Sequence, residues 1–447
     1  MATLKKLRLN INSLPLFVSE GWVKAVTSNS VTAYLPEAAI GNLCYIKRVD
    51  HKEIPAQVIG FEDKLVKLAP FDTVDGIAPE AVVRNTGRAP SVSFSSKIIG
   101  GVYDPLLNPL FAEDSNNEES NSSWQISLTS SSPSPIKRRR ITKQLVTGIR
   151  VIDLFCPIGY GQRLGLFAGP GVGKSTLLGS IARNANVDVV VVALIGERGR
   201  EVREFLEDSL GDEGRKKSVV VVSTSDETPI RRKLALLTAT SVAEQFREQG
   251  KDVLLLADSL TRAARAIREV GLAVGEMPVR QGYPPSVYTE LPSLLERAGT
   301  SESQGSITAI YTVLTNDSEL EPDPLAEEVK SILDGHITLS KEFASRGLYP
   351  AVDPRLSISR LKSALQTNEE IQLSQQVLRF YHLLLEEKEL AQISGSSSSS
   401  LKAIESLEEE FWSWHCQDPK ECSDNGVLEA FELVKAWKNY KRSLEAE

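Results

Sequence analysis

The residues best suited to chemistry lie near the middle of the chain, where glycines, a lysine and two hydroxyl side chains follow one another. Residues 168–176 read AGPGVGKST, close to the phosphate-binding pattern G-x-x-x-x-G-K-[ST] with Ala168 at its first position. Glycines let backbone N–H groups turn toward phosphate oxygens, and a lysine adds positive charge. The pattern predicts a nucleoside triphosphate site with Mg²⁺ at the serine hydroxyl. Its expected ligands are Gly169, Gly171, Val172, Gly173, Lys174, Ser175 and Thr176.

The segments around this loop supply the context that the motif requires. The apolar run RLGLFA at residues 163–168 precedes it, and a helical pattern over residues 174–185 follows it. A strand before the loop and a helix after it are typical of phosphate loops. The N-terminus of such a helix adds partial positive charge where the phosphates bind. We therefore expect a nucleotide-binding α/β domain.

Two carboxylates follow apolar runs further along the chain. Asp258 ends the run at residues 253–257, where an acid at a strand's carboxyl end can orient hydrated Mg²⁺. Glu197 follows the very apolar run at residues 187–195, where it could polarise the water that attacks a γ-phosphate. Arg198 could then stabilise charge on the phosphate oxygens. From the residues alone, a solvated strand end with an intrahelical ion pair explains Glu197 and Arg198 equally well.

Composition narrows the class of protein. A chain of 447 residues with a net charge of −8 predicts two to four domains and does not suggest a nucleic-acid partner. Four histidines and four dispersed cysteines offer no zinc-ligand spacing, so a reduced cytoplasmic protein is expected. We expect neither a membrane-spanning run nor a signal peptide.

Pattern changes along the chain predict four regions. Short β-type runs predict a small barrel over residues 1–90, and a connecting segment over 91–145 contains a polar, disordered insertion at 113–135. Apolar strands alternating with helical segments over 146–355 predict a parallel sheet covered on both faces. The expected strands lie at 187–195, 218–222, 253–257 and 307–314, and a helix is expected over 230–249. Residues 356–447 read as helical.

Three smaller features carry weaker expectations. The basic cluster at residues 137–140 is expected to be a solvated linker, and the serine run at 396–400 a flexible joint. Near the end of the chain, four apolar residues share one helical face and are expected to pack in a core. They are Leu428, Phe431, Val434 and Trp437.

Several long segments resemble the ATPases of type III protein secretion, in both their flagellum-specific and injectisome forms. They include residues 196–211 (GERGREVREFLEDSLG), 254–276, 282–299 and 333–353. These ATPases are similar in turn to the catalytic subunit of rotary ATP synthases. The resemblance covers roughly residues 20 to 365. It implies a RecA-like core, an α/β fold with a parallel sheet, preceded by a small β-barrel and followed by a helical C-terminal domain.

The resemblance implies a role for each matching residue. Lys174 would contact the β- and γ-phosphates, with Ser175 and Asp258 organising Mg²⁺ and Glu201 near the metal. Glu197 resembles the general base, and its presence indicates the catalytic rather than the non-catalytic type of subunit. Base selectivity favours ATP, since no N-K-x-D element for guanine is present. The remaining roles are a γ-phosphate contact for Arg198, a conformational sensor for Arg262, adenine stacking for Tyr349 and, for Arg360, an arginine finger donated to a neighbouring subunit.

The resemblance also implies partners. They are a homo-hexameric ring, export-gate stalk and regulator proteins, secretion chaperones and exported substrates, with peripheral attachment at the inner face of the cytoplasmic membrane. The family's C-terminal pattern, in the region that faces the central stalk and the chaperone–substrate complexes, is not visible after about residue 385. Flagellar and injectisome systems share the core motifs and stay equally open.

Three other functions remain as alternatives. A catalytic subunit of a rotary proton- or sodium-translocating ATPase shares the core, but the GYPPSV and LLERAG segments favour the secretion type. An RNA-translocating hexameric ATPase would need aromatic stacking platforms and a basic surface in the first 90 residues. A scaffold that binds nucleotide without hydrolysis would lack the catalytic carboxylate.

Overall fold

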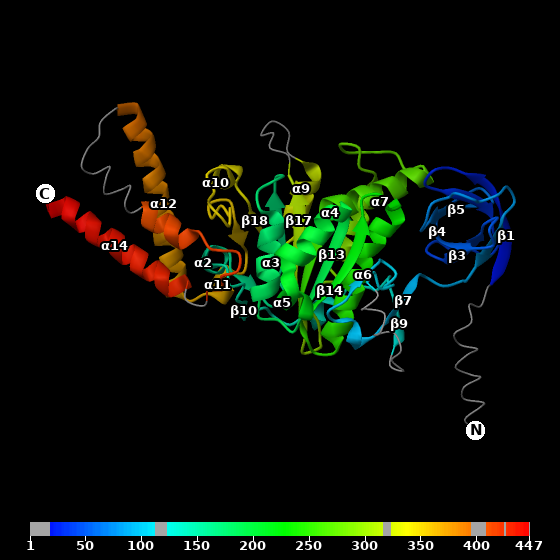
Figure 1. Ribbon diagram of the computed structural model, residues 1–447, viewed down its shortest axis with the longest axis horizontal. Coiled ribbons are helices and arrows are strands. Elements are labelled where there is room, and N and C mark those ends of the chain that lie inside the picture. Colours follow the sequence, from blue (N-terminus) through cyan, green and yellow to red (C-terminus); the bar gives the residue numbers. More distant parts are fainter. Residues whose placement is uncertain (1–17, 112–122, 316–322, 395–407, 424–425, 447) are drawn as a thin grey trace, which may run out of the picture.

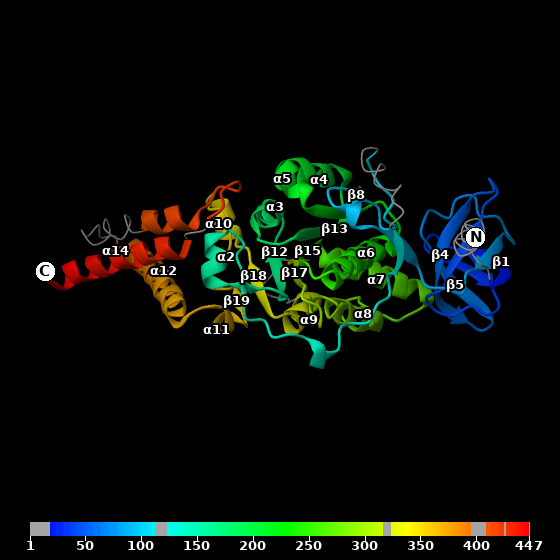
Figure 2. The ribbon, with the colours of Figure 1, turned by 90° about the horizontal axis from the view of Figure 1, so that it is seen from below.

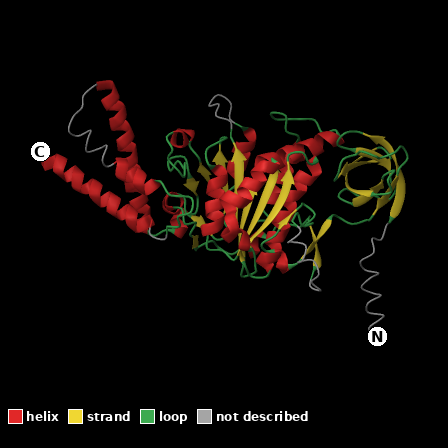
Figure 3. Ribbon diagram, in the orientation of Figure 1, coloured by secondary structure: helices red, strands yellow, loops and turns green. Residues whose placement is uncertain are grey.

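The computed structural model describes residues 18–111, 123–315, 323–394, 408–423 and 426–446. A barrel lies at one end of the elongated molecule, a sheet covered by helices occupies the middle, and two long helices form the other end (Figure 1). Figure 3 shows the same division by element type, with strands alone in the barrel and long helices at the C-terminal end. The predicted fold class is confirmed.

Six strands close the N-terminal barrel in the order β1-β2-β5-β4-β3-β6. The alternation of inward and outward side chains along each strand explains why the sheet closes into a barrel around a core. In β4 every second residue points inward, and Ile54, Ala56 and Val58 are at most 3% exposed. A closed barrel leaves no unpaired strand edge. The strands are β1 (Ser19–Val26), β2 (Val31–Tyr34), β3 (Leu43–Lys47), β4 (Glu53–Glu62), β5 (Leu65–Pro70) and β6 (Val82–Asn85).

The central sheet has nine strands, eight of them in the order β19-β18-β12-β17-β15-β13-β14-β8. The six strands from β18 to β14 run parallel, and the short β19 and β16 are antiparallel. Every residue of β13 is buried, which is why its sequence is almost continuously apolar. The strands are β8 (Val102–Tyr103), β12 (Arg163–Ala168), β13 (Val189–Glu197), β14 (Ser218–Thr224), β15 (Asp252–Asp258), β16 (Gly299–Thr300), β17 (Ser306–Leu314), β18 (Gly335–Thr338) and β19 (Ile358–Ser359).

Helices cover both faces of this sheet, as the sequence predicts. In Figure 2, α3, α4 and α5 lie above the strands, and α6, α7, α8 and α9 lie below them. Helix α6 coincides with the predicted helical segment, and α3 begins at the lysine of the phosphate loop. The helices are α2 (Arg150–Phe155), α3 (Lys174–Asn184), α4 (Gly199–Glu204), α5 (Gly211–Lys216), α6 (Pro229–Glu248), α7 (Leu260–Val274), α8 (Pro285–Leu295), α9 (Pro324–Ile332), α10 (Lys341–Ser345), α11 (Lys362–Leu365), α12 (Asn368–Ser394) and α14 (Gly426–Ala446).

The connecting segment 91–145 is more ordered than its composition suggests. Strand β7 (Ser91–Phe94) pairs with β9 (Trp124–Ser127), and β8 joins the edge of the central sheet. The prediction of disorder over 113–135 is therefore wrong for β9, while residues 112–122 lie outside the described residues. Alternating apolar side chains explain the strand, because Ile126 and Leu128 are buried against the core that includes α6.

The basic cluster at residues 137–140 is only partly the expected solvated linker, because its residues are exposed except for the half-buried Arg138, yet several of them bind the core. Arg138 Nη1 donates to the Ala298 carbonyl at 2.8 Å, and Arg139 Nη2 donates to the Gly305 carbonyl at 2.8 Å. Lys137 forms an ion pair with Glu302 at 3.0 Å. Carbonyl oxygens in the turns around β16 need donors, and the guanidinium groups supply them.

The C-terminal helices α12 and α14 pack beside α2 at one end of the sheet domain (Figure 1). The prediction that one face of α14 packs in a core is only partly confirmed. Val434 is buried, but Leu428 is 65% exposed and Phe431 is 41% exposed. The helix instead docks through a neighbouring face. That face carries Val427, Ala430, Leu433, Val434 and Trp437. The serine run at 396–400 lies outside the described residues.

A buried ion pair joins α6 to the turn that follows α8. Arg297 is 3% exposed and donates to both oxygens of Glu244, to Ser241 Oγ and to the Leu128 carbonyl. We predict that Arg297→Ala lowers the free energy of unfolding by about 3–5 kcal/mol, because a buried carboxylate loses its partner. Urea denaturation followed by circular dichroism measures the loss.

The matched control for this prediction is Arg203→Ala. Arg203 pairs with Glu207 one turn along a helix, but its side chain is 80% exposed. Water replaces such a partner readily, so the denaturation midpoint should barely move. Equal effects of the two substitutions would contradict the structural role given to Arg297.

Candidate functional site

The phosphate loop lies between the carboxyl end of β12 and the start of α3. Gly171 and Gly173 have φ angles of 75° and 82°, in the left-handed region that glycine enters without strain. Val172 between them is 2% exposed and anchors the loop in the core. Lys174 is the first residue of α3, so its side chain and the free N–H groups of the helix's first turn face the same space.

Two carboxylates converge on Lys174 from the ends of neighbouring strands. Its ammonium contacts the carboxylate of Asp258 at the end of β15 and lies 3.8 Å from Glu197 Oε1 at the end of β13. Thr312 donates a hydrogen bond of 2.8 Å to Asp258 Oδ1, and the Arg262 guanidinium contacts Glu197. Residues far apart in sequence meet here because the parallel strands all end at one edge of the sheet.

Burial and charge set the protonation of the acidic groups. Glu197 is 7% exposed, and this burial raises its pKa above the ordinary value, while Arg262 and Lys174 act in the opposite direction. The hydrogen bond that Glu201 shares with Glu197 lowers the pKa of Glu201. Of these two carboxyl groups, Glu197 therefore has the stronger hold on a proton when the site contains no nucleotide.

A cleft of about 550 Å³ opens above these groups. The predicted metal ligands Ser175, Glu201 and Asp258 all line it, together with Glu197, so hydroxyl and carboxylate oxygens face the space where phosphates would lie. The part of the chain that the structure describes holds no cluster of three or more histidine, cysteine or acidic residues able to bind a metal unaided. Such a donor set suits Mg²⁺, which is commonly held by one or two protein oxygens together with substrate phosphates and water.

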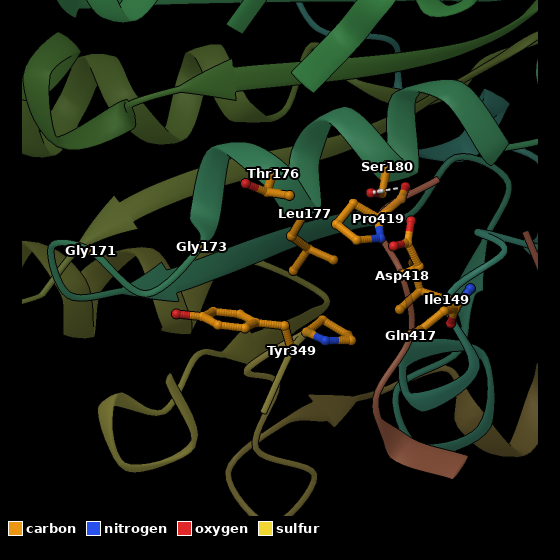
Figure 4. A pocket seen from close by; sticks show the side chains of 11 residues that line it. Ile149, Gly171, Gly173, Thr176, Leu177, Ser180, Tyr349, Gln417, Asp418 and Pro419 are labelled. Atoms are coloured by element: carbon orange, nitrogen blue, oxygen red, sulfur yellow. Dashed lines mark hydrogen bonds between the residues drawn. The ribbon is translucent and has the colours of Figure 1, made fainter. Parts of the chain in front are cut away.

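A second cavity of about 340 Å³ continues from the loop along α3 (Figure 4). The ring of Tyr349 forms one wall: a Cβ on Gly173 would lie only 3.1 Å from Tyr349 Cε1. Leu177 and Thr176 of α3 face it, and Ile149 lies at the end remote from the loop. An aromatic face beside a phosphate site offers a stacking surface for a base.

The far wall of this cavity comes from a segment that sequence reasoning missed. Residues 415–421, named here the C-terminal clasp, bind three parts of the core. Gln417 N donates to the Tyr349 carbonyl at 2.9 Å, and Gln417 Nε2 donates to the Gly148 carbonyl at 2.6 Å. Ser180 of α3 donates to the Pro419 carbonyl at 2.7 Å. No motif marked the clasp, since its partners lie more than 60 residues away in sequence.

Two arginines singled out in the sequence lie outside both cavities. Arg198 is 74% exposed in its side chain and pairs with Glu201 at 3.6 Å, at the rim of the cleft. Arg360 is exposed, follows the edge strand β19 and donates to the Lys330 carbonyl at 3.3 Å. Neither residue lines the phosphate cleft or the base cavity of its own chain.

Comparison with known proteins agrees with this geometry. The nucleotide-binding domain of the ATP synthase alpha/beta family matches residues 148–359, and the beta-barrel domain of that family matches residues 31–87. The flagellum-specific ATP synthase of Borreliella burgdorferi is 45% identical over 76% of this chain and 77% of its own length. The type 3 secretion system ATPase of Xanthomonas euvesicatoria is 44% identical over 83% and 84%. This chain belongs to the flagellar and type III secretion ATPases.

A solved structure extends the match to the whole fold. The assembled ATPase EscN from the type III secretion system of enteropathogenic E. coli superposes with a TM-score of 0.83 at 38% identity. The match covers 93% of this chain and all of the EscN chain. The predicted family and the predicted ATPase activity are therefore confirmed. Within the described ranges, none of the helices is long and apolar enough to cross a lipid bilayer.

The clasp carries a titratable group whose effect on stability can be measured. His415 is fully buried, its Nε2 lies 3.1 Å from the Pro350 carbonyl, and burial lowers its pKa to about 4. In the unfolded chain the imidazole is protonated as pH falls through about 6.5, whereas in the folded chain it is protonated only near pH 4. We predict that this group contributes roughly 3 kcal/mol of stability that is lost as pH falls through this window.

The measurement is the pH slope of the unfolding free energy, followed by tryptophan fluorescence, in the native chain and in His415→Gln. The two slopes must be compared because Asp153 changes the unfolding free energy with pH in the opposite direction to His415. Burial raises the pKa of Asp153 to about 7, so its contribution to stability falls as pH rises. Identical slopes for the two proteins between pH 6.5 and 4 would contradict the prediction.

Proposed function

We propose that this ATPase hydrolyses ATP with Mg²⁺ to energise the export of unfolded proteins through a flagellar or injectisome apparatus. The observation that carries the proposal is the meeting of Lys174, Glu197 and Asp258 at one edge of the sheet. A nucleotide-binding protein without hydrolysis would need the loop and the lysine but not a buried carboxylate facing the γ-phosphate. The names of the similar proteins support the export function.

Each residue of the site has a defined part in the proposed reaction. The N–H groups of residues 169–176 bind the phosphates, and Lys174 neutralises the β- and γ-phosphates. Ser175 and Asp258 would hold Mg²⁺ with Glu201 nearby; when bound, the ion neutralises charge between the phosphates. Glu197 orients and deprotonates the attacking water once the nucleotide draws Lys174 away from it.

The proposal requires more than one subunit. Arg360 is exposed at the edge of the sheet, outside the site of its own chain, and would exchange its hydrogen bond to the Lys330 carbonyl for a neighbour's γ-phosphate. Arg198 pairs with Glu201, which lines the cleft, so its exposed side chain would turn toward a bound phosphate. We infer a homo-hexameric ring in which each site is completed by the next subunit. The assembled form of the similar ATPase EscN supports this inference.

The proposed partners follow from the same comparisons. EscN has been solved in complex with its central stalk EscO, which supports a stalk partner for this chain. Regulators, chaperones and exported substrates complete the proposal, together with a peripheral position at the inner face of the cytoplasmic membrane. Exposed Leu428 and Phe431 on α14 are available for contact with other proteins.

The first of two predictions drawn from the proposed reaction concerns the general base. Glu197→Gln should bind ATP with near-native affinity and lose turnover by about 10²–10⁴-fold, because an amide cannot accept the water's proton. Calorimetric titration measures binding, and phosphate release measures turnover. The control is Glu207→Gln, which changes an exposed acid in the helical segment after Glu197 and should retain activity. Near-native turnover of Glu197→Gln would contradict the role of Glu197.

The second prediction concerns Arg360. Arg360→Ala and Lys174→Ala should each lose most activity, since arginine fingers contribute about 10³–10⁵ in rate. Mixed rings should regain part of it, because Lys174→Ala chains supply Arg360 to intact loops on their neighbours. Chains carrying both substitutions should give no rescue when mixed with Arg360→Ala. Absence of rescue in rings shown to contain both single variants would contradict donation between subunits.

A further inference from the structure

The cavity beside the phosphate loop has two distinct ends. Gly171 and Gly173 border the end where phosphates bind, and the clasp residues Gln417, Asp418 and Pro419 border the other (Figure 4). The Tyr349 ring lies between these ends. A purine stacked on Tyr349 therefore points one of its edges at the clasp. This consequence rests on the proposed nucleotide substrate.

Most side chains at the clasp end cannot form a hydrogen bond with that purine edge. Ile149, Pro350 and Pro419 are apolar. The amide of Gln417 is fully used, because Oε1 accepts from Arg150 N at 3.1 Å and Nε2 donates to the carbonyls of Gly148 and Glu421. These contacts exclude Gln417 as the group that distinguishes one base from another.

The hydroxyl of Ser180 is also committed. It donates to the Pro419 carbonyl at 2.7 Å and accepts from Arg183 at 3.3 Å. Thr176 faces the same cavity but is only two residues from Lys174, toward the phosphate end (Figure 4). The polar group left at the clasp end is the carboxylate of Asp418.

Asp418 is held in place yet has an open acceptor. Its Oδ1 accepts from Lys420 N at 2.8 Å, a turn that fixes the side chain. Asp418 is exposed, and none of the hydrogen bonds among the described residues uses its Oδ2. An ionised carboxylate only accepts hydrogen bonds, so it favours an amino group and disfavours a carbonyl oxygen.

We propose that Asp418 selects the base of the nucleotide, by accepting a hydrogen bond from the C6 amino group of adenine. Hypoxanthine and guanine carry a carbonyl oxygen at C6, which a carboxylate held opposite C6 repels; only a carboxylate placed opposite N1 would accept their N1–H instead. The hydrogen-bond network of the clasp gives this choice its rigidity, since Gln417 and Pro419 on either side of Asp418 are bound to the core. Asp418 is thus a specificity-determining residue in a segment that no motif marked.

Asp418→Asn is the sharpest test. Asparagine keeps the Oδ1 acceptor for Lys420 N, and its amide can also donate to a carbonyl at C6. Dissociation constants for ATP and inosine triphosphate, which has a carbonyl at C6 in place of the amine, are measured by calorimetry in the Glu197→Gln background to prevent hydrolysis. We expect a preference for ATP of about tenfold or more that falls toward unity in Asp418→Asn.

Two controls separate base selection from other effects. Purine riboside triphosphate carries hydrogen at C6, so its affinity should not change between the two proteins. Glu421→Gln removes a neighbouring clasp carboxylate that pairs with Arg150 at 3.5 Å and does not line the cavity, and should keep the native ratio. An unchanged ATP-to-inosine triphosphate ratio in Asp418→Asn would overturn the proposal. Because binding is the readout, that result leaves the proposed hydrolysis standing, and loss of hydrolysis leaves this test intact.

Discussion

The ammonium of Lys174 between two buried carboxylates is the interaction on which the site depends. Asp258 is 2% exposed and Glu197 is 7% exposed. Burying two ionised carboxylates so near each other would cost free energy if no cation lay between them. The same lysine is the group that an incoming phosphate needs. In the proposed reaction, nucleotide binding exchanges the carboxylate partners of Lys174 for phosphate partners and leaves Glu197, still in contact with Arg262, to act on water.

The fold brings these groups together because parallel strands end at the same edge of a sheet. Strands β12, β15 and β13 end at the same edge and deliver the phosphate loop, Asp258 and Glu197 there. The strands themselves are fully buried, so the position of their ends is fixed by the core. Function then needs only short loops on a rigid support.

Local signals in the sequence predicted most of the catalytic edge. The phosphate loop requires a strand before it and a helix after it, and β12 and α3 appear at those residues. Continuous apolar runs identified β13, β14, β15 and β17 because each is buried on both faces. The two carboxylates were found because each follows such a run directly.

Features built from distant contacts were not predicted. The clasp depends on bonds such as that between Arg150 N and Gln417 Oε1, 267 residues apart, and nothing local marks either partner. Strand β9 is a short apolar alternation within a polar stretch, and its burial depends on α6. The basic residues 138 and 139 look solvated until the carbonyls around β16 are in place.

We propose that one chain cannot complete the site, because Arg360 lies outside both cavities of its own chain. The most direct test is the specific ATPase activity of the native chain as a function of its concentration, with Glu197→Gln as the blank. The account predicts an activity per chain that rises steeply as chains assemble and then reaches a plateau. Full activity per chain at concentrations where light scattering shows only monomers would contradict it.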